Sequence, residues 1–154
     1  MRNVKLKIES PPLAIIYGIF AVMAGLLLPV LLIPVVKFTG YSEIVEEIVK
    51  ALVVLLLILK MPSHGVQILI GAVFGFLFGI SENFLYLNQI FQFGDLSIFW
   101  QRFLWTVPMH IITVLVILFS GLAGKKFVIF GLAGAIILHA LFNSMVVNFL
   151  LQQQ

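Results

Sequence analysis

The third apolar segment of the chain, Gln67 to Leu87, ends with an acid and an amide inside a run long enough to cross a bilayer. A hydrocarbon core of about 30 Å requires roughly twenty apolar residues in a helix, and an ionisable group at that depth is costly to bury. Glu82 and Asn83 lie within this run, in the sequence Gly79-Ile80-Ser81-Glu82-Asn83. The segment therefore predicts a membrane helix that carries part of a functional site.

Composition places the whole chain among integral membrane proteins. Hydrophobic residues make up 62% of the 154 residues and charged residues only 10%, a balance typical of chains that cross a bilayer. We expect an all-α polytopic membrane helix bundle of about five transmembrane helices, with residues 1–154 as a single domain. The net charge of +3 comes from residues at segment ends, so it indicates topology and no nucleic-acid binding. The absence of cysteine excludes disulfides, thiolate metal sites and a cysteine nucleophile.

Hydropathy and helix-breaking residues divide the chain into five apolar stretches. Pro29 and Pro34 are expected to bend the end of the first helix, and Ser42 is expected to cap the start of the second. The segment Asn88–Gln101 is expected to be a loop. The predicted helices are Leu13–Val36, Glu43–Leu59, Gln67–Leu87, Phe103–Gly121 and Phe127–Leu151.

The basic residues give an orientation. Arg2 to Lys7, Lys60 and Lys125-Lys126 fall on one side of a five-span topology, and this side is cytoplasmic by the positive-inside rule. We expect a protein of the cytoplasmic membrane with its N-terminus inside and its C-terminus outside. Arg102, on the outer side, departs from this pattern.

On this topology the unusual polar residues fall at similar depths. At 1.5 Å per residue, Glu82 and Asn143 lie about 6 Å below the outer face of the hydrocarbon core, and His110 and His139 about 11 to 13 Å below it. The pair Glu46-Glu47 begins the second helix at that same face. Four helices therefore predict one site in the outer half of the membrane.

Small residues recur at intervals of four on two of the predicted helices. Residues so spaced share one face, and small side chains there allow two helices to pack closely. We expect both faces to pack against neighbouring helices. The two series are Gly71, Gly75, Gly79 and Asn83, and Gly131, Ala135, His139 and Asn143.

The predicted layer contains what a water-using hydrolase needs, a general base and an electrophilic stabiliser. Lys50 lies four residues after Glu46 and three after Glu47, so it can pair with one of them and leave the other as the base. His139 and Asn143, one turn apart, can both point at one carbonyl oxygen. The candidate residues are carboxylates, imidazoles and an amide: Glu46, Glu47, Glu82, His110, His139 and Asn143.

Other protease chemistries lack their residues. Asp95 is the only aspartate, so an aspartyl dyad is excluded. The sequences His-Glu-x-x-His and Gly-x-Ser-x-Gly are absent, which removes the zincin signature and the serine elbow. Zinc held by His110, His139 and a glutamate such as Glu82 stays open, because these are acceptable zinc ligands.

Four short motifs follow one another between Tyr41 and Asn143: Glu46-Glu47-Ile48-Val49-Lys50, Phe78 to Tyr86, Arg102 to His110, and His139 to Asn143. In this order they resemble the motifs of the PrsW family of intramembrane proteases. The stretch Glu46-Glu47-Ile48-Val49-Lys50 resembles the family's Glu-Glu-x-x-Lys, and Phe78 to Tyr86 resembles its Phe-x-x-x-Glu-Asn with a following tyrosine. Arg102 to His110 is similar to its Arg…Pro-x-His segment, and His139 to Asn143 is similar to its final His-x-x-x-Asn/Asp. The family belongs with the type II CAAX prenyl endopeptidases and the bacteriocin-immunity proteins, and its members are typically longer than this chain.

The resemblance implies an intramembrane endopeptidase that cuts membrane-associated protein substrates with a glutamate-activated water. A reaction with a glutamate-activated water requires no cofactor, although members of the family have also been called metalloproteases. Glu46 or Glu47 would be the general base, and His110 and Glu82 would hold or polarise the water. The remaining roles are oxyanion binding by His139 and Asn143, and support from Lys50, Asn83 and Arg102.

Two other functions stay open on the sequence alone. A proton-coupled transporter can also use buried glutamate and histidine as a relay, although the chain shows no inverted repeat. A non-proteolytic, immunity-type binding protein could keep the fold, but a degenerate relative is expected to lose at least one polar group, and all are present. The expected partners are a membrane-bound protein substrate and the lipid bilayer, and assembly into a homo-oligomer stays open.

Overall fold

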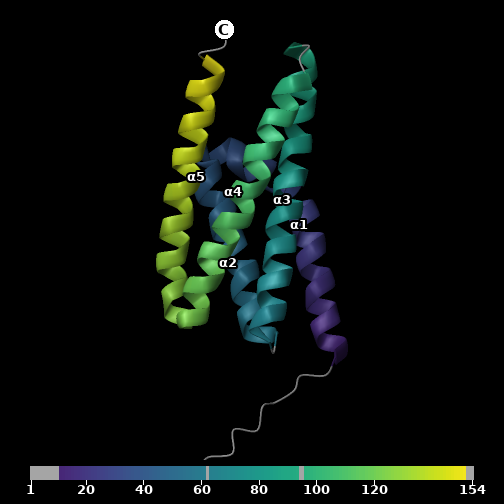
Figure 1. Ribbon diagram of the computed structural model, residues 1–154, viewed down its shortest axis with the longest axis vertical. Coiled ribbons are helices and arrows are strands. Elements are labelled where there is room, and N and C mark those ends of the chain that lie inside the picture. The colour runs from purple at the N-terminus through teal and green to yellow at the C-terminus, as the bar shows by residue number, and fades with distance from the viewer. Residues whose placement is uncertain (1–10, 62, 94–95, 152–154) are drawn as a thin grey trace, which may run out of the picture.

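The structure, a computed structural model, describes residues 11–61, 63–93 and 96–151. Five long helices run up and down as an antiparallel bundle (Figure 1), and no strand occurs in these ranges. The predicted all-α membrane bundle is confirmed. The elements are α1 (Pro11–Thr39), α2 (Ser42–Lys60), α3 (His64–Phe93), α4 (Leu96–Ala123), the 3-10 turn η1 (Lys125–Phe127) and α5 (Val128–Leu151).

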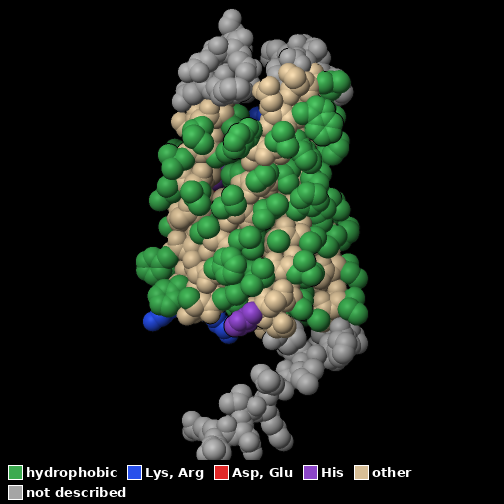
Figure 2. Space-filling view, in the orientation of Figure 1, with side chains coloured by type: hydrophobic (Ala, Val, Ile, Leu, Met, Phe, Trp, Pro, Cys, Tyr) green, Lys and Arg blue, Asp and Glu red, His purple; other side chains and the backbone are tan. Residues whose placement is uncertain are grey.

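Four of the described helices, α1, α3, α4 and α5, are long and apolar enough to cross a membrane. Hydrophobic side chains are spread over the whole length of the face shown in Figure 2, and no acidic side chain is visible on it. Such a surface is unfavourable in water and suits contact with lipid tails, whose core also requires that each helix satisfy its own backbone groups. The chain is therefore an integral membrane protein.

Helix α2 is the most polar helix, and it packs against all four of the others. Its buried face begins with three ionisable residues, Glu46, Glu47 and Lys50, and continues with apolar ones such as Val54 and Leu57. The apolar half anchors the helix in the core of the bundle. The charged half is thereby held inside the protein, away from the lipid.

Two local expectations are wrong. The segment Asn88–Gln101, predicted as a loop, is mostly helical, because α3 continues to Phe93 and α4 begins at Leu96. The segment has a single glycine and no proline to break a helix, and the Phe84 and Phe99 rings, 6.0 Å apart, join the two helices across this hairpin.

The predicted cap of α2 is also wrong. Ser42 is the first helical residue, Tyr41 occupies the cap position, and no side-chain cap is formed. The Ser42 hydroxyl donates instead to the Glu43 carboxylate at 3.0 Å, a local bond that serine commonly makes near helix ends. Gly40, with φ of 75°, makes the turn that precedes α2, in a conformation that glycine adopts without strain.

The predicted close packing of the glycine faces is confirmed. A Cβ atom on Gly75 would lie 2.8 Å from the His110 carbonyl oxygen and 2.9 Å from the Ile111 Cα. On Gly79 it would lie 2.9 Å from the Val107 Cα. Helix α3 therefore touches the backbone of α4 at the level of His110, so these glycines help to set where that imidazole lies.

The substitution Gly75→Ala is expected to destabilise the protein. Overpacking against backbone costs about 1–3 kcal/mol, which outweighs the gain of roughly 1 kcal/mol in helix propensity. Gly134→Ala is the matched control, because its Cβ would meet only Val116 Cγ1 at 3.7 Å. Unfolding of both variants in detergent tests this, and equal stability of the two would contradict the close approach of α3 to α4.

Candidate active site

The predicted polar residues come together in the interior of the bundle, although they lie on four different helices. Helix α2 contributes an acidic pair and a lysine, and each of the other three contributes one residue. The site thus depends on tertiary packing and not on any single segment. These residues are Glu46, Glu47 and Lys50 from α2, Glu82 from α3, His110 from α4 and His139 from α5.

Lys50 is fully buried, with no exposed surface. Its Nζ donates to Glu47 Oε1 at 2.6 Å and to His110 Nδ1 at 2.7 Å, and it lies 4.5 Å from the centroid of the Phe78 ring. A buried ammonium is tolerated only when a counter-charge and hydrogen-bond acceptors surround it. Phe78 is not among the predicted site residues. It lies four residues before Glu82, on the same face of α3.

A chain of hydrogen bonds extends from Lys50 in both directions. Glu47 Oε1 also accepts from His139 Nδ1 at 2.8 Å. On the other side, His110 Nε2 is paired with Glu82 Oε2. Five side chains from four helices therefore form one continuous network, and the two rings lie nearly perpendicular, with centroids 5.3 Å apart.

The network defines which ring nitrogens carry protons. A lysine ammonium can only donate, so His110 Nδ1 must accept, and the ring proton lies on Nε2, where it is donated to Glu82. The carboxylate of Glu47 can only accept, so His139 carries its proton on Nδ1. In its neutral form His139 therefore presents a lone pair at Nε2.

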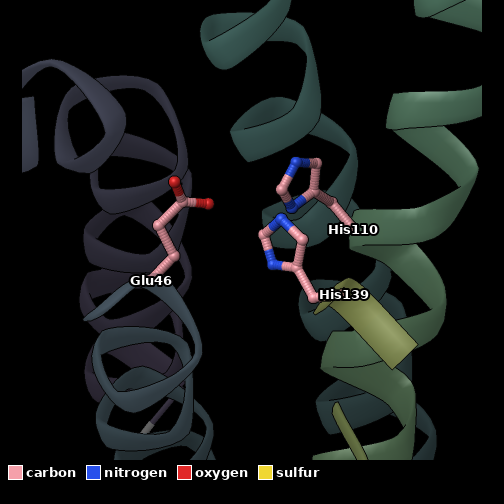
Figure 3. Close-up of side chains that lie close together, drawn as sticks. All are labelled: Glu46, His110 and His139. Carbon is pink, nitrogen blue, oxygen red and sulfur yellow. The ribbon is translucent and has the colours of Figure 1, made fainter. Parts of the chain in front are cut away.

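Glu46 differs from its neighbour. Lys50 pairs with Glu47, and no described residue donates a hydrogen bond to the Glu46 carboxylate. Its Oε2 is buried without a partner, and the residue is 9% exposed. Figure 3 shows this carboxylate facing the imidazole rings of His110 and His139. Of the two glutamates that the sequence left as alternatives, Glu46 is the one with a free carboxylate.

Three further predicted residues lie outside the hydrogen-bonded network. Asn143, one turn after His139, is half-buried. Asn83 is fully buried, and neither atom of its amide has a partner. The Arg102 guanidinium lies 4.1 Å from the centroid of the Tyr86 ring.

A metal ion has suitable donors here. One ligand atom each from Glu46, His110 and His139 lies within 4.8 Å of the others, and two histidines with a glutamate form a known catalytic zinc set. The free carboxylate of Glu46 fits a ligand, and His110 would exchange one of its two present partners. Glu82, expected as a third ligand, instead bonds to His110, a position typical of a carboxylate behind a metal-bound histidine.

A buried network of carboxylates and imidazoles within apolar helices suits a membrane enzyme. The family model described as PrsW family intramembrane metalloprotease matches residues 13–153. The chain belongs to the PrsW family, and it is a membrane protease with protein substrates. No curated protein and no solved structure gives a match.

Lys50→Met is expected to lower stability, because it leaves Glu47 as an uncompensated buried charge. Breaking a buried pair from one side costs about 3–5 kcal/mol. Adding Glu47→Gln to Lys50→Met should recover part of the loss, since the double variant buries no unpaired charge. Lys60→Met, at an exposed lysine, is the control, and unfolding in detergent is the measurement. Additive losses in the double variant would contradict a coupled pair.

Proposed function

We propose that this chain is an intramembrane endopeptidase that hydrolyses membrane-associated proteins with a water molecule activated by Glu46. The observation that carries the proposal is the division of labour between the two adjacent glutamates. Lys50 and His139 both bond to Glu47, whereas the Glu46 carboxylate lies free in front of two imidazoles. A general base needs an unoccupied lone pair within reach of the water. Glu47 also has an unpartnered Oε2, but Lys50 and His139 hold its carboxylate through Oε1, so Glu46 is the better placed of the two.

Glu47, Lys50 and Glu82 then act as positioning residues. Glu47 holds the His139 ring, and Glu82 with Lys50 holds the His110 ring from its two nitrogens. A ring fixed at both nitrogens loses its rotational freedom, which is the geometric requirement for a preorganised site. On this view the network keeps the two imidazoles in place while Glu46 takes the proton.

The two remaining functional groups receive different tasks. His139 offers a lone pair at Nε2, so it is suited to accept a hydrogen bond from the attacking water. Asn143 carries an amide N–H that can donate, and it follows His139 by one helical turn. We therefore assign oxyanion binding to Asn143, and to His139 only in a step in which its ring is protonated.

Water must reach this site inside the membrane, and the buried polar atoms support such access. Five described side chains near the site have buried atoms without a hydrogen-bond partner. Buried polar groups are normally satisfied by protein or by ordered water. A hydrolase needs water at its site. The five side chains with unpartnered buried atoms are Glu46, Glu47, Asn83, Arg102 and Thr106.

Metal assistance is the second form of the same activity, and the donor set of Glu46, His110 and His139 favours it. When bound, zinc would lower the pKa of a water molecule and polarise the substrate carbonyl. Glu46 and the two imidazoles would hold the ion, and Glu47 and Glu82 would orient the rings from behind. In the proposed reaction, by contrast, Glu46 is itself the general base and not a metal ligand.

We also place the site in the outer half of the bilayer, with the N-terminus inside. Lys60 and Lys125-Lys126 lie where α2 and α4 end, whereas Glu46 lies near the start of α2. Basic residues favour the cytoplasmic side.

The order of the four motifs supports kinship with the type II CAAX prenyl endopeptidases and the bacteriocin-immunity proteins.

Glu46→Gln is expected to reduce cleavage by about 10²–10⁴-fold, because the amide cannot take a proton. Folding should be unaffected, since no described hydrogen bond is lost. Glu43→Gln, one turn earlier on α2, is the matched control and should retain activity. Cleavage of a membrane-anchored substrate panel in liposomes is the measurement, and full activity of Glu46→Gln would refute the assignment.

Metal content distinguishes the two forms of the activity. Purified protein that is free of metal and still cleaves after treatment with a chelator is the result expected for a glutamate base. Stoichiometric zinc, with activity lost on chelation and restored by adding zinc back, would instead make Glu46, His110 and His139 ligands. Elemental analysis of the same sample used in the cleavage assay gives the answer.

A further inference from the structure

Arg102 is a charged residue that the proposed reaction does not use. It lies near the start of α4, and it precedes Thr106 and His110 at intervals of four residues, which places all three on one face. Thr106 and His110 are buried. The lipid-facing side of α4 is marked by Leu104 and Trp105, which are 67% and 69% exposed. Arg102 therefore lies on the side of the helix that faces the site.

The guanidinium of Arg102 is held in place but incompletely used. Its Cζ lies over the Tyr86 ring, 4.1 Å from the ring centroid. Its Nε is buried without a hydrogen-bond partner, and no ion pair to it is found among the described carboxylates. The Tyr86 side chain also shares a hydrogen bond with Arg102. A guanidinium has five N–H donors, so one such bond leaves others that can bind a carboxylate.

The distance from Arg102 to the catalytic level sets the length of chain that could connect them. Eight residues of α-helix separate it from His110, a rise of about 12 Å. An extended peptide covers about 3.3–3.6 Å per residue. A segment lying along this face would therefore place the third or fourth residue from the scissile bond beside the guanidinium. Thr106, with a buried hydroxyl lacking a partner, lies between the two.

We propose that Arg102 is a specificity-determining residue that binds a carboxylate of the substrate, three or four residues from the bond that is cut. The inference rests on the proposed proteolytic function and adds a substrate preference to it. The carboxylate can be an aspartate or glutamate side chain or the C-terminus of the substrate. A lipid phosphate would suit an arginine on the opposite side of α4, beside Leu104 and Trp105, and is therefore less favoured.

The test uses the full-length protein in phosphatidylcholine liposomes with single-span substrates whose outer segment is randomised. Mass spectrometry identifies the bonds that the wild type cuts. Matched substrates then carry Glu or Gln at the third and fourth positions from the cut, and either a free or an amidated C-terminus. The enzymes compared are the wild type, Arg102→Met, Arg102→Lys and Lys125→Met, the last removing an exposed charge remote from the site.

The wild type is expected to prefer the substrate with the carboxylate by about tenfold or more in kcat/KM, the usual size of a charge-assisted hydrogen bond. Arg102→Met should cleave charged and neutral substrates equally, at the rate at which the wild type cleaves the neutral one. Arg102→Lys should keep part of the preference, because it retains the charge without the planar fork. Lys125→Met should keep all of it.

Each other outcome overturns a defined part of the argument. If the wild type cleaves and Glu46→Gln does not, but substrate charge has no effect, the assignment of Arg102 fails and the proposed function stands. If Glu46→Gln cleaves as well as the wild type, the proposed function fails. An effect of Arg102→Met that appears only when phosphatidylglycerol is added, whatever the substrate charge, would assign Arg102 to a lipid phosphate and overturn the inference.

Discussion

The buried ammonium of Lys50 is the group on which the geometry of the site depends. A single charge in the interior of a membrane bundle costs several kcal/mol unless partners surround it. Glu47 and His110 supply these partners at 2.6 and 2.7 Å from two different helices. Because the same contacts fix the carboxylate and the imidazole, the requirement to compensate one charge also orders the groups around it.

That network requires α4 to lie unusually close to α3. Gly75 and Gly79 place the backbone of α4 where a Cβ atom would otherwise lie, so the imidazole of His110 can reach both Lys50 and Glu82. Association of apolar helices in lipid depends on close packing, since lipid tails compete equally for their surfaces. The small residues and the charged network thus support the same arrangement, one through contact and the other through compensation of charge.

The fold class and the convergence of four helices could be predicted from the sequence, because hydropathy and helical rise are properties of single segments. Which of Glu46 and Glu47 pairs with Lys50 could not be predicted, since residues three and four positions before a lysine both share its face of a helix. That choice depends on the approach of α5, which brings His139 to Glu47. The sequence did not predict that α3 extends to Phe93 or that α4 begins at Leu96. The contact between Phe84 and Phe99 joins two different helices, so it cannot be read from either segment alone.

Some buried polar atoms of the site have hydrogen-bond partners, and others have none. Lys50, Glu47 Oε1 and the two histidines are joined by hydrogen bonds, whereas Glu46, Asn83, Thr106, Arg102 and the second oxygen of Glu47 keep buried atoms without partners. A transmembrane helix already satisfies its own backbone groups, so a helical substrate has few groups to offer these atoms. An extended segment presents free N–H and C=O groups along its length. The distribution of unsatisfied atoms therefore favours a substrate that unwinds where it enters the site, as hydrolysis of a peptide bond by a bound water also requires.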